Sequence, residues 1–573
     1  MTPQTASPFS QPRPAEACHP PRRPRRSPAL LAAATFATAV LLAAACAGGG
    51  TGSAGGENGI AIAAPSEAAE RNAAALASRP GEGIRAAGGT MRGGAPCPAP
   101  GSPGAPDTFK LGVLSPDVDQ LGDIGLANLV FDPVDRTFNA FVNQVNEFGG
   151  IGGNCFEFVY YEWGFTNPAE DIGAICAALP QDQPLVLFGF ALSPELIGCS
   201  TLAGQIPTIG LYSAFPADLF TQASGLLFAD HGSLEFLLYN GVLAAEAAGT
   251  LNGAVVGLVH SGDDSAASIR TTMALASEET GIEPVAAVGV PEGLYGTAVV
   301  VVEEQFRAIG GELFHPDEAA FAQAAAQLPP GLGELMAAVR GFSIATAAAM
   351  AAAGVTAVVT SADWVATRNL MRAAEFVGWR PAWIANDTQL ALITLTDAPA
   401  AQGLNLVQAS SRRATDDPID GLDRGCLSLR NTSVAAEPFD HRYHTDAWSL
   451  LTSTCDYLDV VFSAVSRVDG PLNRDAFLAA LAETDYTTAH GQRLQFAAND
   501  TYGSDSFRLL SADPDCVLNE WGCMRPLTGW YDSATARLMP LPRCDWCMSP
   551  MADWYAASAP AGAASGTEEP SEG

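Results

Sequence analysis

The feature that most constrains the fold of this chain is a repeated alternation of short apolar runs with amphipathic segments. Residues 109–114 and 155–161 are strand-like, and a third apolar run follows at 184–190. Between the first two, apolar residues recur at the three- and four-residue spacing of a helix: Phe138, Phe141, Val142, Val145 and Phe148. Another helix is expected from about 168 to 179. This alternation predicts an α/β fold with a parallel sheet covered by helices on both faces.

A second series of strand-like runs repeats the pattern later in the chain. The runs "GAVVGLVHSG", "GVTAVVTSAD" and "RPAWIAND" begin at residues 253, 354 and 380, with helical segments between them. Two series of similar size predict two Rossmann-like lobes. Because ligands bind at the carboxyl ends of parallel strands, two such lobes can hold a ligand between them. Two stretches between 230 and 350 look like the same strand–helix unit, so one of them is interpreted as an insertion.

Residues 1–46 have the features of an export signal. Arginines between residues 22 and 26 precede an uncharged, alanine-rich run at 29–45, and small residues follow Cys46. This pattern predicts a signal peptide; a transmembrane anchor is the alternative, although the run is short and weakly apolar for a span. "LAAAC" at 42–46 resembles the lipobox of bacterial lipoproteins, which predicts lipidation of Cys46. Its leucine lies four rather than three residues before the cysteine, so ordinary cleavage stays open.

Composition separates a folded part from two flexible ends. Residues 47–106 and 556–573 are dominated by small and polar residues and contain few large apolar side chains, so a disordered tether and a disordered tail are expected. The formal net charge of the chain is −33. Nucleic-acid binding requires the opposite sign and is excluded. The charge is interpreted as a solvated acidic surface.

The cysteines indicate an oxidising compartment. Of the twelve cysteines, Cys18 and Cys46 lie in the signal segment, and the even number that remains suits disulfides in an exported protein. The cysteines between residues 516 and 547 end in C-x-x-C and could form a zinc site. A second close pair is missing from this set, so disulfides are the favoured interpretation.

Signatures of enzymes and cofactor sites are missing from the sequence. The run "GFALS" at 189–193 is not a G-x-S-x-G nucleophile elbow. No phosphate-binding loop, H-E-x-x-H motif or dinucleotide fingerprint occurs. His441 and His444 lack an adjoining acidic motif and are interpreted as part of a polar helix start. The sequence therefore predicts a protein that is not an enzyme and holds neither cofactor nor metal.

Several motifs, taken in order, resemble one family. "LGVLSP" at 111–116, "FNAFVNQVNEFGGIGG" at 138–153 and "YYEWGFTNPAE" at 160–170 resemble the first quarter of the type I periplasmic binding proteins. The most similar branch is the leucine/isoleucine/valine-binding group, the receptors of branched-chain amino-acid ABC importers. The resemblance continues through "LMRAAEFVGWRP", "YHTDAWSLLTSTCDYL" and "GQRLQFAAND", and it covers about 107–540. Each motif is weak alone, whereas their shared order and spacing are fairly specific.

The resemblance implies a clamshell of two hinge-connected lobes that closes on a small molecule without catalysis. The first lobe is expected at 107–230 plus about 390–490, and the second at 231–389 plus about 491–545. It also implies an ABC permease as partner, export to the periplasm or cell surface, and a lipid anchor in the membrane at Cys46. A sensor that acts with a separate signalling partner and, more remotely, an exported enzyme are the alternatives.

In the first lobe, the resemblance assigns ligand contacts residue by residue. Ser193 corresponds to the serine after the third strand, where a hydroxyl and the N–H groups of a helix start favour a carboxylate. A plain helix N-cap is the alternative. The next loop contributes Tyr212 and Ser213, with Ala214 at the position of the usual threonine. Leu121 corresponds to an apolar wall of the site.

In the second lobe, Asp363 and Trp364 correspond to the tyrosine loop of the family, and Asp387 to the acidic residue that takes the amino group of an amino acid. Helix capping and core packing are the alternatives for these three residues. Ser193 and Asp387 preserve one anion holder and one cation holder, but the missing threonine and tyrosine argue against a branched-chain amino acid. The expected ligand is an amino acid or a related amide or carboxylate, and urea and aromatic acids are further possibilities.

Overall fold

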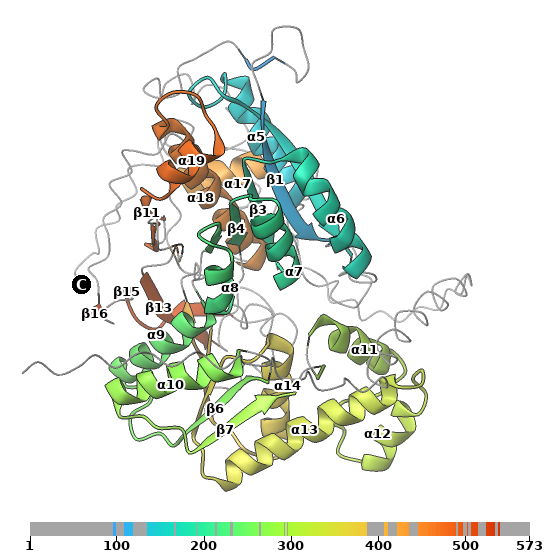
Figure 1. Cartoon of the computed structure of the whole chain (residues 1–573). Coiled ribbons are helices and arrows are strands. Elements are labelled where there is room, and N and C mark those ends of the chain that lie inside the picture. Colours follow the sequence, from blue (N-terminus) through green and yellow to red (C-terminus); the bar gives the residue numbers. More distant parts are fainter. Residues whose placement is uncertain are drawn as a thin grey trace, which may run out of the picture. The chain divides into compact units, whose positions relative to one another are not determined.

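The structure is a computed structural model of the whole chain (Figure 1). It describes residues 96–98, 108–117, 134–164, 168–190, 192–211, 215–229, 233–262, 265–291, 293–294, 296–386, 406–410, 417, 421–434, 445–488, 491–496, 501, 503, 506–513, 523–532 and 537–538. The chain divides into two compact units, Met1–Gly52 and Ser53–Gly573, and all described residues belong to the second. The predicted signal segment and C-terminal tail, and most of the predicted tether, lie outside the described residues.

The first sheet consists of five parallel strands in the order β2-β1-β3-β4-β5. The strands are β1 (Thr108–Pro116), β2 (Cys155–Trp163), β3 (Val186–Phe190), β4 (Thr208–Leu211) and β5 (Leu227–Ala229). Every residue of the central strand β3 is buried, as its unbroken apolar run predicts. The direction of winding reverses between β1 and β3, so the topological switch point of this sheet lies there.

Helices cover both faces of the first sheet, as predicted. The helices α6 (Pro168–Asp182), α7 (Pro194–Ile197) and α8 (Ala217–Gln222) pack on one face, and a π-helical turn, η2 (Gly198–Ala203), continues α7. The opposite face is covered by α5 (Val134–Glu147). This helix buries Phe138, Phe141, Val142 and Val145 at the predicted spacing. It is followed by Gly149 and Gly150, whose positive φ angles suit glycine and let the chain turn.

Helices from much later in the chain complete the core beside α5. They are α17 (Gly421–Ser433), α18 (Thr445–Arg467) and α19 (Arg474–Leu481), followed by a hairpin of β11 (Asp485–Thr487) and β12 (Arg493–Gln495). Their buried apolar side chains, among them Leu451, Phe462 and Phe477, belong to the same cluster as Phe138 and Phe188. We call the first sheet, its helices and this hairpin the first lobe.

The second sheet repeats the winding of the first. Its parallel strands lie in the order β7-β6-β8-β9-β10, and antiparallel strands extend it beyond β10. The parallel strands are β6 (Val256–Ser261), β7 (Ala286–Val290), β8 (Ala357–Thr360), β9 (Ala382–Asn386) and β10 (Leu406–Ser410). The antiparallel strands are β13 (Ser506–Asp513), β14 (Cys523–Pro526), β15 (Tyr531–Asp532) and β16 (Arg537–Leu538). The second switch point lies between β6 and β8.

Helices also cover the second sheet on both faces. One face carries α9 (Leu234–Ala247) and α10 (Ala266–Thr280). The other carries α13 (Leu332–Ala352), which packs on α14 (Trp364–Phe376) and whose Met350 lies against Gly257 of β6. We call this sheet and its helices the second lobe. The α/β fold with two parallel sheets flanked by helices, predicted from the sequence, is confirmed.

Of the two strand–helix units expected between 230 and 350, the first is present, whereas the apolar run of the second lies in a helix, Thr297–Ala308, with no strand before it among the described residues. The first forms a regular β6–α10–β7 unit, whereas three helices instead of one connect β7 to β8. The additional helices are α11 (Thr297–Ala308) and α12 (Glu318–Ala325); both pack on α13, and α11 also packs on α14. Because one helix suffices for a parallel crossover, α11 and α12 are the insertion.

The helix α13 is, among the described residues, long and apolar enough to cross a membrane by length and composition. Buried core helices meet the same criterion. On α13, Met336, Val339 and Met350 are buried, and Arg340 forms an ion pair with Glu318. The apolar character of α13 is therefore accounted for in part by its packing in the second lobe.

The chain passes between the two lobes three times. The first crossing, 230–232, follows β5; the second, 411–420, follows β10; and the third, 497–505, precedes β13. The strand β10 pairs with β9, so residues 406–410 belong to the second sheet, although the sequence placed the boundary near 389. Likewise, β12 pairs with β11, so 491–495 stays with the first lobe. Strand pairing sets these boundaries, and the apolar pattern of a single segment does not show which strand it pairs with.

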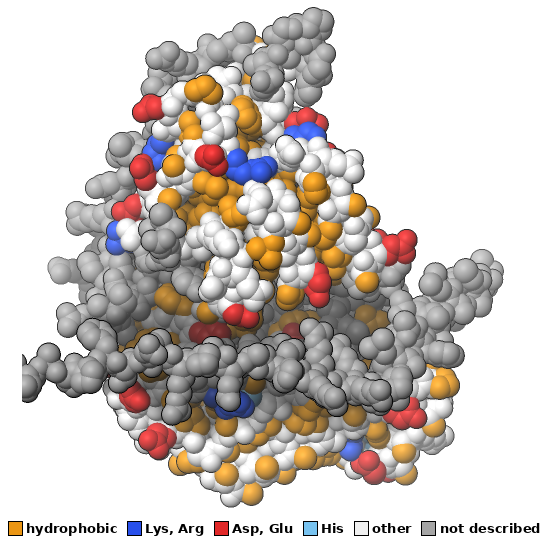
Figure 2. Space-filling view, viewed as in Figure 1, with side chains coloured by type: hydrophobic (Ala, Val, Ile, Leu, Met, Phe, Trp, Pro, Cys, Tyr) orange, Lys and Arg blue, Asp and Glu red, His pale blue; other side chains and the backbone are white. Residues whose placement is uncertain are grey.

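Six cysteines in the described part of the chain form disulfides, which confirms this prediction for them. The pairs are Cys97–Cys155, Cys176–Cys199 and Cys426–Cys455. On the face of the molecule shown in Figure 2, the described acidic side chains are scattered over the surface rather than gathered in one patch. This distribution agrees with the interpretation of the negative charge as a solvated surface.

Candidate functional site

The two sheets place polar helix caps at equivalent positions. In the first lobe, β3 is followed by Ser193, which caps α7; in the second, β8 is followed by Asp363, which caps α14. Both β3 and β8 are the third strands of their sheets and border the switch point. Ligands of open α/β sheets bind outside the carboxyl ends of the strands at such points. The duplicated winding therefore marks Ser193 and Asp363 as the corresponding candidate contacts of the two lobes.

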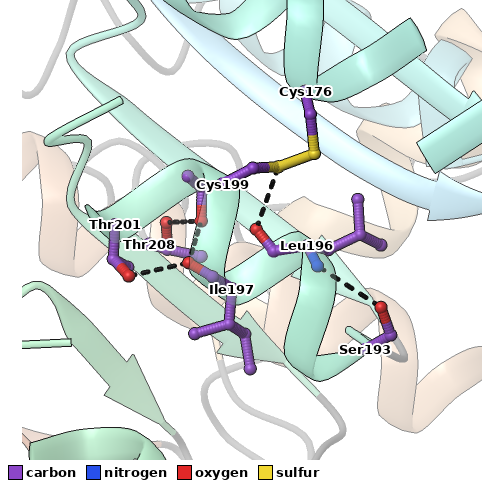
Figure 3. Close-up of a disulfide and its surroundings, with 8 residues drawn as sticks. Cys176, Ser193, Leu196, Ile197, Cys199, Thr201 and Thr208 are labelled. Carbon is purple, nitrogen blue, oxygen red and sulfur yellow. Dashed lines mark hydrogen bonds between the residues drawn. A yellow bond between two sulfur atoms is a disulfide. The ribbon is translucent and has the colours of Figure 1, made fainter. Parts of the chain in front are cut away.

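Ser193 stands at the start of α7 with extended backbone angles (Figure 3). Its hydroxyl oxygen accepts a hydrogen bond from the backbone N–H of Leu196 at 3.3 Å, and Pro194 occupies the first helical position. This is the geometry of an N-cap, the alternative role considered for this residue. The hydroxyl proton is not used by the cap. Ser193 can therefore cap α7 and still donate a hydrogen bond.

The substitution Ser193→Ala is expected to destabilise the protein by about 1 kcal/mol, because the N–H of Leu196 loses its side-chain acceptor. Ser193→Thr keeps a hydroxyl acceptor for this N–H group and should lower the stability by less. Chemical denaturation of both variants measures the difference. Equal stability of the alanine variant and the parent would mean that water replaces the cap fully.

A compact network holds the backbone that follows Ser193. The disulfide between Cys176 and Cys199 joins α6 to the π-helical turn η2 (Figure 3). The buried hydroxyl of Thr201 donates to the carbonyl oxygen of Ile197 at 2.7 Å, and that of Thr208 donates to Ser200 at 2.9 Å. These contacts fix the end of α7 that is opposite to Ser193. The helix α7, which Ser193 caps, is therefore held at its C-terminal end.

Asp363 links two helix starts of the second lobe. Its Oδ1 accepts hydrogen bonds from the N–H of Val365 at 2.8 Å, within α14, and from the N–H of Gly296 at 3.3 Å, just before α11. Burial raises the pKa of Asp363, and the backbone N–H donors act in the opposite direction. Capping, the alternative role considered for Asp363, is therefore observed, and it joins the inserted helices to the switch point.

An ion-pair cluster lies between α11 and α14, the helix that Asp363 caps. Glu303 of α11 is almost fully buried and pairs with Arg368 and Arg372 of α14. The guanidinium carbon of Arg368 lies 5.7 Å from the centre of the Trp364 ring, within range of a cation–π contact. Burial raises the pKa of Glu303, whereas the two arginines lower it. The effect of the arginines is the larger, so the pKa lies below its usual value. This cluster joins α11 to α14.

The other predicted contacts lie outside the described residues. Leu121 falls in the segment between β1 and α5, Tyr212 and Ser213 directly follow β4, and Asp387 directly follows β9. Each of the last three therefore follows the carboxyl end of a strand. Cys46, the predicted lipid site, also lies outside the described residues.

The structure adds Ser361, which the sequence interpretation did not single out. It directly follows β8 and is 4% exposed, and its hydroxyl forms no hydrogen bond with the described residues. Beside it on the neighbouring strand, His260 is also buried, and its Nδ1 lies 2.6 Å from the carbonyl oxygen of Ser261. Two adjacent hydroxyl residues at the end of an apolar run, Thr360 and Ser361, were the available sequence signal.

Within the part of the chain that the structure describes, no group of three or more His, Cys, Asp or Glu residues is arranged to hold a metal ion. The chemical groups at the two switch points are hydroxyls, a carboxylate and backbone N–H groups. Such groups donate and accept hydrogen bonds and can orient a small polar ligand.

No family model and no curated protein matches this chain. Among solved structures, it is similar to a branched-chain amino-acid ABC transporter protein from Thermus thermophilus with bound valine, at 16% identity and a TM-score of 0.49, covering 75% of this chain and 98% of that one. It is also similar to a possible leucine/isoleucine/valine-binding protein from Rhodopirellula baltica, at 11% identity and a TM-score of 0.47, covering 75% and 98%.

A third solved structure is a solute-binding protein of an ABC transporter from Rhodopseudomonas palustris in complex with 4-hydroxybenzoate, at 13% identity and a TM-score of 0.49, covering 74% of this chain and 97% of that one. At such identities and TM-scores the likeness assigns no role to this chain.

Proposed function

We propose that this protein is an extracytoplasmic solute-binding lipoprotein that captures a small molecule between its two lobes and delivers it to an ABC permease. The observation that carries the proposal is the duplicated winding, which gives each lobe a switch point with a polar residue at the carboxyl end of its third strand. The three crossings between the lobes support a hinge for closure.

The ligand that these groups suit is an amino acid or a related amide or carboxylate. In the first lobe, the free proton of Ser193 and the loop with Tyr212 and Ser213 would hold a carboxylate or amide oxygen. In the second lobe, Asp387 would accept hydrogen bonds from an amino or amide nitrogen. Leu121 and Trp364 would supply apolar contact with the body of the ligand.

Asp363 fits a supporting role in this proposal. Its carboxylate already accepts two backbone N–H groups, so it would act through the position of α14 rather than by direct contact. Ser361 is the better candidate for a hydrogen bond to the ligand from this loop, because its buried hydroxyl is not otherwise used by the described residues.

The proposal is tested by a thermal-shift screen of a soluble protein spanning residues 96–555 against amino acids, amides, urea and aromatic acids. A ligand at a hundredfold excess over its Kd should stabilise the folded state by about 2.7 kcal/mol. Stabilisation without turnover of the compound would support capture. Turnover of any stabilising compound would contradict it and point to an enzyme.

For an amino-acid ligand found in this way, Ser193→Ala and Asp387→Ala should each weaken binding by roughly tenfold or more, because a hydrogen bond to a charged group contributes about 1.5–3 kcal/mol. Isothermal titration calorimetry measures the change in Kd. Ser224→Ala is the matched hydroxyl control, because the hydroxyl of Ser224 is exposed and donates to the carbonyl oxygen of Gln222. Unchanged affinity in both site variants would show that the site assignment is wrong.

A further inference from the structure

The strand β2 forms one edge of the first sheet. Among the described strands it pairs with β1 alone, in a continuous register over its full length. The carbonyl oxygen of Trp163 accepts the N–H of Asp117, which follows β1, so Trp163 turns its backbone groups toward β1. The direction of these groups alternates along a strand. Every second residue before Trp163 therefore turns its N–H and carbonyl groups outward: Glu162, Tyr160, Phe158 and Phe156.

Asn146 of α5 blocks the first part of this outer edge. Its Nδ2 donates to the carbonyl oxygen of Phe156 at 2.6 Å, and its Oδ1 accepts the N–H of Phe156 at 2.9 Å. The amide thus makes the two bonds that a neighbouring strand would make. Further along, the N–H and carbonyl groups of Phe158 and Tyr160 form no hydrogen bond with the described residues. This part of the edge can accept another strand.

The edge lacks the features that usually prevent strand addition. Proteins protect sheet edges with lysine, proline or bulges. The run "FEFVYYE" at 156–162 contains neither residue, and its register with β1 is unbroken. The other edge strand of this sheet, β5, is closed, because the N–H of Ala229 donates to Thr501 at 3.2 Å and its carbonyl oxygen accepts the N–H of Gly503 at 2.8 Å. Of the two edges, β2 is the one open to a further strand.

The side chains at this edge form an aromatic ladder. Phe158 and Tyr160 are half-buried on the same face of the sheet, and their rings stack with centres 6.2 Å apart. On the inner side, Phe158 stacks on Phe138 of α5, also at 6.2 Å. Val159, between them, projects to the opposite face and packs against the cluster beneath α6. Aromatic side chains paired across strands stabilise a sheet, so the ladder favours a partner strand that is also aromatic.

We propose that β2 pairs antiparallel with β2 of a second copy of this chain, about a two-fold axis at Val159. Phe158 of one copy then lies opposite Tyr160 of the other, each pair exchanges both backbone hydrogen bonds, and the two ladders join. A register centred on Phe158 would need the backbone groups of Phe156, which Asn146 occupies. One centred on Tyr160 would place Phe158 opposite Glu162 rather than opposite a ring. The proposal goes beyond the proposed function and does not depend on it.

Charge is compatible with this register. Glu157 of one copy lies opposite Tyr161 of the other, so the two Glu157 residues are about 13 Å apart along the strands, and the two Glu162 residues about 20 Å. Both separations exceed the screening length of about 8 Å at physiological ionic strength. The net charge of −33 nevertheless opposes the approach of two copies. The dimer is therefore expected to be weak and to become stronger as salt is added.

A cysteine at the axis tests the register. In the antiparallel pair, the two Val159 residues are not hydrogen-bonded to each other, and their Cα atoms lie about 4.5 Å apart. This separation suits a disulfide. Val159→Cys should therefore give a covalent dimer on mild oxidation, seen on a non-reducing gel. Glu157→Cys, on the same face of the strand, is the matched control and should not cross-link, because its two copies are about 13 Å apart.

Analytical ultracentrifugation measures the association without a cross-link. The full chain with Cys46→Ser, which removes the predicted lipid site, should dimerise more strongly in about 0.5 M than in about 0.15 M NaCl. Val159→Glu should raise the dimer Kd by about tenfold or more, because it sets like charges opposite each other. Val159→Thr keeps the branched shape and should change the Kd by less than about threefold.

Two results would overturn the proposal. One is a chain that stays monomeric in the higher salt up to about 0.1 mM protein. The other is cross-linking of Val159→Cys no greater than that of Glu157→Cys, which would place any dimer contact elsewhere. If circular dichroism shows that Val159→Glu does not fold, the comparison of the two cysteine variants decides. The measurements use no ligand, so they stand whatever the outcome of the ligand screen.

Discussion

Glu303→Gln is expected to lower the free energy of unfolding by about 3–5 kcal/mol, because it removes the buried carboxylate that pairs with two largely buried arginines. Glu303 is 4% exposed, and its partners Arg368 and Arg372 are 2% and 20% exposed. Glutamine keeps the shape of the side chain but not its charge. The guanidinium of Arg368 would then stay buried without the negative charge of this carboxylate beside it. Urea unfolding measures the loss.

The exposed pair of Arg380 and Glu375 is the control for this prediction. Their side chains are 67% and 50% exposed, and exposed pairs contribute about 0–1 kcal/mol. Glu375→Gln should therefore have little effect. A loss in Glu303→Gln no larger than that in Glu375→Gln would contradict the prediction and show that water or other groups compensate for the missing carboxylate.

The pH dependence of the Glu303 contribution has a defined sign. The arginines hold the pKa of Glu303 below its usual value despite burial, so its contribution is fully present above the unfolded pKa of about 4.3. It is lost as the pH falls through the still lower pKa of the folded state. The difference between the parent and Glu303→Gln should therefore shrink on acidification below about pH 4. Unfolding measured from pH 7 down to pH 3 tests this directly.

The sequence predicted the layers of the fold because these depend on local patterns. The spacing of Phe138, Phe141 and Val145 defined α5, and the unbroken apolar run defined β3. The assignment of β10 to the second sheet was missed because it follows from pairing with β9 and, far along the chain, with β13. The insertion was noticed, but only packing showed that α11 and α12 are the additional helices.

For the candidate site, the sequence predicted which loops carry polar residues better than it predicted the role of each residue. Ser193 and Asp363 were singled out through the resemblance to the family, and the structure shows both as helix caps, the alternative considered for each. The burial of Ser361 and the contact between Asp363 and Gly296 depend on tertiary packing, which residue type does not show.

Replacement of both Cys97 and Cys155 by alanine is the second change with a large expected effect. The disulfide closes a loop between residues 58 positions apart. By the chain-entropy model, such a loop contributes about 4 kcal/mol through the unfolded state. The shorter loop of Cys176–Cys199, 23 positions, should contribute about 3 kcal/mol. Denaturation of the two double-alanine variants compares them, and a loss below about 1 kcal/mol for Cys97 and Cys155 would contradict the prediction.

The location of this disulfide gives its loss a second, more specific consequence. Cys155 begins β2 and is paired with Thr108, the first residue of β1, while the N–H of Cys97 donates to the carbonyl oxygen of Asn146 at 2.8 Å. The chain that precedes Cys97 is therefore attached at the amino ends of the strands, whereas the candidate contacts follow the carboxyl ends. A force applied to the segment before Cys97 would therefore act on the disulfide and β2 before it acted on β1. Limited proteolysis should then cut between residues 97 and 108 without releasing the preceding segment from the parent, and should release it from the double-alanine variant.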